Sequence, residues 1–181
     1  KYNLIIIEDA AEALGSYYNK KHAGTFGDIG VLSFNGNKTI TCGSGGAILT
    51  NNKNIADKAR HLISTAKIFH PYKYVHDQVG FNYRMTNLNA ALGYSQIKRI
   101  RQILKKKRKL FYFYNKIFKG NKYFKLINEP KKSKSNFWLQ TILVNKKYSS
   151  YVQKIIKDLN KQKIYVRPGW ELMTNLNYFK N

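Results

Sequence analysis

Residues 30–38 read GVLSFNGNK, an apolar run that passes through a serine into a polar turn ending at Lys38. A glycine-rich segment (TCGSGG, residues 41–46) and a second apolar run come next. Upstream, residues 4–9 read LIIIED, so another apolar run ends on two carboxylates. Short continuous apolar runs of this kind are typical of strands buried on both faces of a helix-flanked sheet. The sequence therefore predicts an α/β fold, with strands over residues 4–8, 31–34 and 46–50.

The rest of the chain predicts helices and a smaller second domain. We expect a helix over residues 53–65 and a long helix that Asn87 caps and that reaches about Lys119. The apolar positions of the long helix recur every three or four residues: Ile97, Ile100, Leu104, Phe111, Tyr114 and Phe118. A polar linker (128–135), a strand (137–144), a helix (149–162) and a strand (164–166) then predict a small α/β lobe. The expected domains are residues 1–120 and 121–181.

Lys38 is the candidate catalytic residue. Most lysines are solvated surface residues, but this one lies in a Gly/Asn-rich turn between two apolar runs, where side chains tend to be placed for function. Asp9 ends the upstream apolar run; alone it would be read as an ordinary strand-end or helix-capping residue. An amine that condenses with an aldehyde, and a carboxylate that keeps a pyridinium nitrogen protonated, are what a pyridoxal phosphate site needs.

Charge and composition leave a second class open. The formal charge is +24, which raises the possibility of a nucleic-acid-binding module, with its best basic patch at residues 105–109 (KKKRK). The excess of positive charge comes mainly from lysine, however, and there are only six arginines. Nucleic-acid surfaces favour arginine for its bidentate geometry. We therefore interpret the patch as a solvated helix face and expect no nucleic-acid partner.

Cysteine and histidine usage narrows the remaining classes. Cys42 is the only cysteine, so a disulfide framework within the chain is excluded and a reducing cytoplasm is the expected compartment. The four histidines lack paired metal-ligand spacing, so no metal is expected. No apolar run approaches the length that spans a bilayer, and no membrane partner is expected.

Two ordered blocks carry a family resemblance. The first comprises EDAAEALG (8–15), GDIGVLSF (27–34) and a lysine five residues after the serine; the second comprises GFNYRM (80–85), AALG (90–93) and a glutamine three residues later. Together they resemble the sugar aminotransferases of the DegT/DnrJ/EryC1/StrS family, which are fold-type I pyridoxal phosphate enzymes. The resemblance implies part of the large domain of that fold, a long connecting helix and a truncated small C-terminal domain. It also implies that the chain is the central and C-terminal part of an enzyme whose site is not whole, and an inactive fragment is therefore an alternative.

The resemblance assigns roles to individual residues. It implies that Lys38 forms the Schiff base with pyridoxal 5′-phosphate and moves the substrate proton, and that Asp9 pairs with the pyridinium nitrogen. It implies that Ser33 binds the phosphate in its own subunit and that Asn82 binds the phosphate of the neighbouring subunit, so a homodimer with shared sites is expected. Glu12 stands where the family usually has a glutamine beside the cofactor ring, and a carboxylate donates a hydrogen bond only when protonated.

The substrate expectation comes from the same resemblance. Residues 65–82 and the segment RPGWELM (167–173) resemble the branch that aminates the 4-keto group of a UDP-linked N-acetylated 6-deoxyhexose, on routes to legionaminic acid and related bacterial surface sugars. Thr174 stands where a histidine is usual in that branch. Glutamate is the expected amino donor. The sugar dehydratases of the fold are an alternative, but they carry histidine in place of the lysine. The residues expected to contact the sugar nucleotide are Tyr83, Arg84, Arg167 and Trp170.

Overall fold

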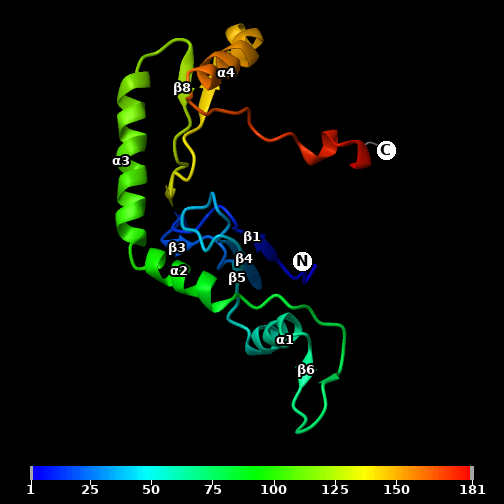
Figure 1. The fold of residues 1–181 in the computed structure, drawn as a ribbon. Helices are drawn as coiled ribbons and strands as arrows, with labels where there is room; N and C mark the ends of the chain where they lie inside the picture. The colour runs from blue at the N-terminus through cyan, green and yellow to red at the C-terminus, as the bar shows by residue number, and fades with distance from the viewer. Residues whose placement is uncertain (1, 180–181) are drawn as a thin grey trace. The chain divides into compact units, whose positions relative to one another are not determined.

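A computed structural model describes residues 2–179 and divides the chain into two compact units (Figure 1). The first unit comprises Lys1–Ile117 and Asn128–Gln140, and the second comprises Phe118–Ile127 and Thr141–Asn181. This division departs from the expected domains in two segments, since residues 118–120 fall in the second unit and residues 128–140 in the first. Residues 128–140, placed by the sequence in the C-terminal domain, pack with the first unit, because their side chains bind the first unit's turns and helix, as described below.

A three-stranded sheet forms the centre of the first unit. Strand β4 (Ile29–Ser33) lies between β1 (Ile7–Asp9), which runs parallel to it, and β5 (Gly46–Leu49), which runs antiparallel. The register pairs Asp9 with Val31, so the carboxyl ends of the two parallel strands meet at one edge of the sheet. The polar residues that end these strands therefore lie on the same side of the fold, where α/β proteins place their ligands.

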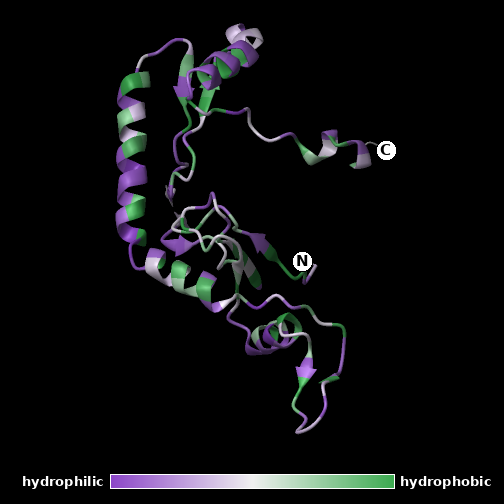
Figure 2. Ribbon diagram, viewed as in Figure 1, coloured by the Kyte–Doolittle hydropathy of each residue, from purple (hydrophilic) through white to green (hydrophobic). Residues whose placement is uncertain are grey.

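The expected strand over residues 4–8 is wrong in its extent and its burial. β1 begins only at Ile7, and the apolar residues leading into it are more than half exposed. Figure 2 shows this N-terminal segment as hydrophobic. Residues 4–6 precede the sheet, so the first part of this apolar run is not covered by neighbouring strands or helices.

Two helical expectations needed correction. Helix α1 (Lys53–Ile63) ends two residues early, because Thr65 and Ala66 adopt positive φ angles of 65° and 50°. The expected long helix is two helices, α2 (Asn87–Ile97) and α3 (Ile100–Phe118), which meet at an angle (Figure 1). The N-terminal cap of α2 is Thr86, not Asn87, since the Thr86 hydroxyl accepts the hydrogen bond from the Asn89 N–H.

Five short strands in the first unit lie outside the strands that the sequence analysis expected. β2 (Tyr17–Tyr18) pairs antiparallel with both β3 (Lys21–His22) and β9 (Ser133–Lys134), and β6 (Lys67–Ile68) pairs with β7 (Val75–His76) as a hairpin. The predicted polar linker thus contributes a strand.

The second unit is a small α/β element. β8 (Phe124–Leu126) pairs antiparallel with β10 (Ile142–Val144), and α4 (Val152–Lys161) follows the 3₁₀ turn η1 (Lys146–Tyr151). Two more 3₁₀ turns, η2 (Met173–Asn175) and η3 (Asn177–Phe179), come after it. The strand expected over residues 137–144 is confined to its last three residues, and the strand expected over 164–166 is absent from this described part of the chain. No helix among the described residues is long and apolar enough to cross a membrane.

Candidate active site

Lys38 lies in the turn that follows β4. Its backbone N–H donates to the Asn35 carbonyl at 3.1 Å, which closes the turn. The Lys38 side chain is 14% exposed, and its Nζ lies 3.1 Å from Glu12 Oε1 and 4.6 Å from the centroid of the Trp138 indole ring. The amine is therefore held between a carboxylate and an aromatic face, which is not the environment of a solvated surface lysine.

Asp9 and Ser33 end the two parallel strands. One carboxylate oxygen of Asp9 accepts the N–H of Ala11 at 3.1 Å, and the Ser33 hydroxyl accepts the N–H of Asn35 at 3.3 Å. Both contacts are local and stabilise the turns that leave the strands. The structure thus places a carboxylate, a hydroxyl and, one turn later, the Lys38 amine at the same edge of the sheet.

Asn82, Tyr83 and Arg84 belong to a different part of the first unit. They line a cavity of about 850 Å³, whose other walls are α1, β4, β5 with the turn before it, and the first turn of α2. The Asn82 backbone forms a bridge with Ser64, and the Tyr83 ring stacks on Phe81 at 5.2 Å. Of the described residues that line this cavity, none belongs to the Lys38 turn, so Asn82 and the Lys38 amine do not share this cavity.

Arg167 and Trp170 lie in the second unit. The Arg167 guanidinium sits over the Trp170 ring at 4.6 Å from its centroid, and both side chains are open to solvent. This is a cation–π contact. It holds the two side chains together in the segment between α4 and η2.

Glu8 has a role that the sequence analysis missed. Its carboxylate accepts backbone N–H groups from Gly24 at 2.8 Å, from Gly27 at 2.6 Å and from Phe26. Burial opposes ionisation of this carboxyl, but the N–H groups of Gly27, Gly24 and Phe26 outweigh it and hold the pKa of Glu8 below its ordinary value. The loop must approach closely, since a Cβ on Gly30 would lie 1.9 Å from the Gly24 carbonyl oxygen. The feature of the sequence that could have indicated this role of Glu8 is a carboxylate at a strand end followed by a glycine-rich loop.

Residues 135–138, which we call the brace, form the second feature that the sequence analysis missed. The brace contributes Asn136, Phe137 and Trp138, all buried, to the first unit. Trp138 contacts Lys38, and the Asn136 side chain donates to the carbonyl of Glu12 at 2.7 Å. Because these partners are about a hundred residues apart in the chain, no local pattern indicated the contact.

The basic patch at residues 105–109 is only partly a solvated face. Lys105, Lys106 and Lys109 are exposed, whereas Lys107 and Arg108 point inward. Burial lowers the pKa of Lys107, whose amine donates to the Trp138 carbonyl at 2.8 Å. Two of the five basic side chains thus have partners within the fold, which weakens the patch as a nucleic-acid surface.

Comparison with known proteins shows to which protein family the chain belongs. The chain belongs to the DegT/DnrJ/EryC1/StrS aminotransferase family, whose family model matches residues 1–181. The predicted family is confirmed.

Three relatives and one solved structure illustrate the similarity. The chain is 42% identical over 144 residues to a GDP-perosamine synthase of Escherichia coli O157:H7, covering 78% of this chain and 38% of that protein. It is 36% identical to EpsN of Bacillus subtilis, provisionally named as a pyridoxal phosphate-dependent aminotransferase, covering 94% and 43%. It is 31% identical to a UDP-4-amino-4,6-dideoxy-N-acetyl-beta-L-altrosamine transaminase of Campylobacter jejuni, covering 99% and 48%.

The solved structure is that of Helicobacter pylori PseC, an aminotransferase involved in the biosynthesis of pseudoaminic acid. It superposes with a TM-score of 0.92 at 29% identity, covering 98% of this chain and 48% of that one. The α/β fold class, expected to be part of the aminotransferase fold, is confirmed. The chain spans about half the length, or less, of the relatives it matches.

Proposed function

We propose that this chain carries the lysine of a pyridoxal phosphate-dependent aminotransferase that aminates a nucleotide-linked 4-keto-6-deoxy sugar. The observation that carries the proposal is the partly buried Lys38 amine in the turn after β4, with Asp9 at the end of the adjacent parallel strand. Membership of the aminotransferase family supports the same activity.

The residues at this edge of the sheet fit the cofactor. Lys38 offers the amine that an aldehyde requires, Asp9 offers a carboxylate for a ring nitrogen, and Ser33 offers a hydroxyl for a phosphate. Glu12 would lie beside the ring as well, since its carboxylate contacts the amine. When bound, pyridoxal phosphate supplies an electron sink that lets an amino group be taken from one substrate and given to another.

The protein's own contribution is positioning and proton transfer. The Lys38 amine takes the proton from the donor carbon that bears the amino group and delivers a proton to the sugar carbon that receives it. Glu12, 3.1 Å from Nζ, stabilises the amine whenever it is protonated. Asp9 would hold the pyridinium nitrogen of the cofactor in its protonated form by charge. Ser33 would orient the cofactor phosphate by hydrogen bonding.

The substrate proposal is a sugar nucleotide with glutamate as amino donor. More specifically, the proposed substrate is a UDP-linked N-acetylated sugar. The sequence of residues 65–82 and the similarity to the Campylobacter jejuni transaminase and to PseC support it. A GDP-linked sugar is the competing candidate, because a relative at higher identity is a GDP-perosamine synthase. Tyr83, Arg84, Arg167 and Trp170 are the proposed sugar-nucleotide contacts.

The assembly proposal is a cytoplasmic homodimer with shared sites. Asn82 lines a cavity to which the Lys38 turn does not contribute, and this supports a role for Asn82 in the neighbouring subunit's site. The phosphate of that site is its proposed ligand.

Borohydride reduction tests the proposed function. In the intact protein that carries this sequence, reduction in the presence of pyridoxal phosphate should fix the cofactor on Lys38, as shown by peptide mapping. Lys38→Ala should abolish transfer of the amino group of glutamate to UDP- and GDP-linked 4-keto-6-deoxy sugars. Label on another lysine would refute the assignment, and the preferred sugar nucleotide would decide between the two substrates.

A further inference from the structure

We propose that Trp138 is a positioning residue for Lys38. The face of its indole ring seats the Lys38 amine, and its N–H fixes the turn that carries the lysine. The inference rests on the proposed function, because it assigns Trp138 to the same site. The inference adds to the site a residue that lies a hundred positions after Lys38 in the chain.

Two contacts join Trp138 to the Lys38 turn. The indole Nε1 donates to the Asn37 carbonyl at 2.6 Å, and the Lys38 amine lies over the ring at 4.6 Å from its centroid. A buried indole N–H needs a hydrogen-bond partner, and a cation over an indole face is attracted by the ring's negative face. One side chain therefore determines the backbone at residue 37 and the amine at residue 38.

Asn136 joins the same segment to the turn that carries Glu12. Its Nδ2 donates to the carbonyls of Glu12 at 2.7 Å and Leu14 at 3.0 Å, while its Oδ1 accepts the backbone N–H of Trp138 at 2.9 Å. Asn136 is buried, so the loss of these bonds would leave polar groups without partners. The brace thus sets the places of both Lys38 and Glu12, the two ends of the 3.1 Å contact.

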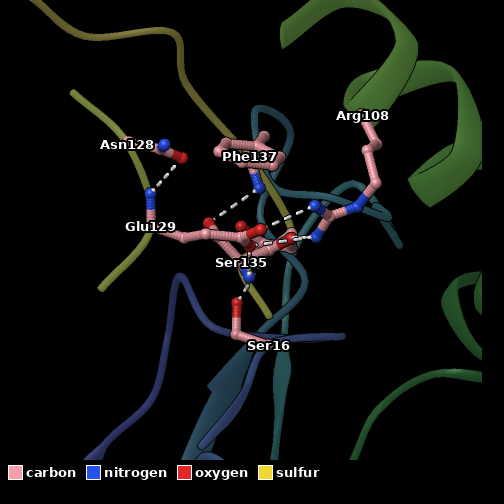
Figure 3. Close-up of polar contacts among 7 residues, drawn as sticks. Ser16, Arg108, Asn128, Glu129, Ser135 and Phe137 are labelled. Carbon is pink, nitrogen blue, oxygen red and sulfur yellow. Dashed lines mark hydrogen bonds and ion pairs between the residues drawn. The ribbon is translucent and has the colours of Figure 1, made fainter. Parts of the chain in front are cut away.

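The brace is supported on its far side by α3. The Arg108 guanidinium binds the Glu129 carboxylate with two bonds of 2.9 and 3.1 Å and also donates to the Ser135 carbonyl at 2.8 Å (Figure 3). It lies over the Phe137 ring, which in turn stacks on Phe111 at 3.9 Å. A functional side chain is held precisely when its neighbours are themselves locked by packing and hydrogen bonds.

A buried tryptophan is more often only part of a core, and the two roles predict different results. In a core role, any substitution that loosens the brace would disturb Lys38. In a positioning role, substitution of Trp138 would disturb Lys38 far more than substitution of its neighbours in the brace. Phe137 offers the comparison, because its ring contacts Phe111 and Arg108. Its neighbour, Trp138, contacts the amine.

The test compares three variants of the intact protein. Trp138→Leu removes the ring face and the N–H, Trp138→Phe keeps a ring face and removes the N–H, and Phe137→Leu is the matched control. In cofactor-free protein, the rate at which an amine-acylating reagent labels Lys38 is measured by mass spectrometry. The exposed Lys53 serves as the internal reference. Addition of pyridoxal phosphate followed by borohydride then measures how fast the cofactor attaches to Lys38.

We expect Trp138→Leu to raise the labelling rate of Lys38 about fivefold, the factor that corresponds to one cation–π contact, and to slow cofactor attachment by a similar factor. Trp138→Phe should give an increase of about twofold, since it retains the cation's partner. Phe137→Leu, which leaves both Trp138 contacts with the Lys38 turn intact, should change both rates much less than Trp138→Leu does, even where it lowers stability.

Equal effects of Trp138→Leu and Phe137→Leu, or no effect of either, would overturn the proposal. Where Trp138→Leu does not fold, Trp138→Phe decides, and an unchanged labelling rate would overturn it. Failure of the proposed function is recognised separately. In that case borohydride fixes no pyridoxal phosphate on Lys38 in the unsubstituted protein, whereas the labelling comparison without cofactor still reports on Trp138.

Discussion

Glu129→Ala is expected to destabilise the first unit substantially, because it removes the counter-ion of Arg108. The two side chains are each 23% exposed, and two parallel hydrogen bonds of 2.9 and 3.1 Å join them. The same carboxylate also accepts the Ser135 N–H at 2.7 Å. The substitution therefore leaves a mostly buried guanidinium without its counter-ion and the Ser135 N–H without its acceptor.

The magnitude follows from this partial burial. A fully buried pair costs about 3–5 kcal/mol when one partner is removed, and an exposed pair costs about 0.2–1 kcal/mol. For a pair that is mostly but not fully buried, with one additional backbone bond, we expect a loss of about 2–3 kcal/mol in the free energy of unfolding.

The pH dependence has a definite sign. The Arg108 hydrogen bond, followed by that of the Ser135 N–H, holds the pKa of Glu129 below its ordinary value despite burial. A carboxyl whose pKa is lowered in the folded state stabilises the fold above its unfolded pKa and loses this effect as the pH falls through its folded pKa. The stability difference between the unsubstituted protein and Glu129→Gln should therefore shrink as the pH falls below about 4.5.

Urea denaturation of the cofactor-free intact protein measures the loss. The matched control is Asp57→Ala, which breaks exposed ion pairs with Lys53 and Arg60 and should cost about 0.5 kcal/mol or less. Our reasoning would be refuted if Glu129→Ala cost no more than Asp57→Ala, or if the Glu129→Gln difference were the same at pH 7 and at pH 3.

Three further predictions concern the proposed site and its support. Asp9→Asn should still bind pyridoxal phosphate, measured by absorbance, but lose most of the transamination rate, because a neutral amide no longer holds a ring nitrogen protonated; near-normal turnover would contradict the pairing. Glu8→Gln should lower the free energy of unfolding by about 2 kcal/mol at pH 7, since three backbone donors lose an ionised acceptor. The effect should fade in acid, because the pKa of Glu8 is lowered, and equal loss at all pH values would argue against this cause. Mixing inactive Lys38→Ala and Asn82→Asp chains should restore part of the activity, as one site of a mixed dimer retains both residues; no recovery after proven subunit exchange would place Asn82 in its own chain's site or in none.

The fold class could be predicted from local patterns, whereas several boundaries could not. β4 and β5 lie where their apolar runs predicted strands, because the runs are bounded by glycines and polar turns. The expected long helix failed at residues 98–99, where the apolar spacing continues through a turn that separates α2 from α3. Periodicity reports which face of a helix is apolar, not whether the helix is continuous.

Some residues of the candidate site could likewise be predicted from local patterns, whereas others could not. Lys38 and Asp9 could be proposed as site residues because each ends or follows a recognisable apolar run, and Ser33 because of the family resemblance. Glu8 was visible but unassigned, since its three partners are backbone N–H groups that any sequence possesses. The ligands of a carboxylate of this kind appear only when the loop is folded around it.

The sequence by itself determined the family and predicted Lys38 and the nearby strand ends as the candidate site, because motif spacing and apolar runs are local properties of the chain. Only the tertiary structure decided that Trp138 and Asn136 support Lys38 and Glu12, and that Arg108 is a structural ion-pair partner and not part of a solvated basic patch. These contacts join residues 21 to 124 positions apart. Burial and packing bring such residues together, and no pattern along the chain encodes a pairing at that separation.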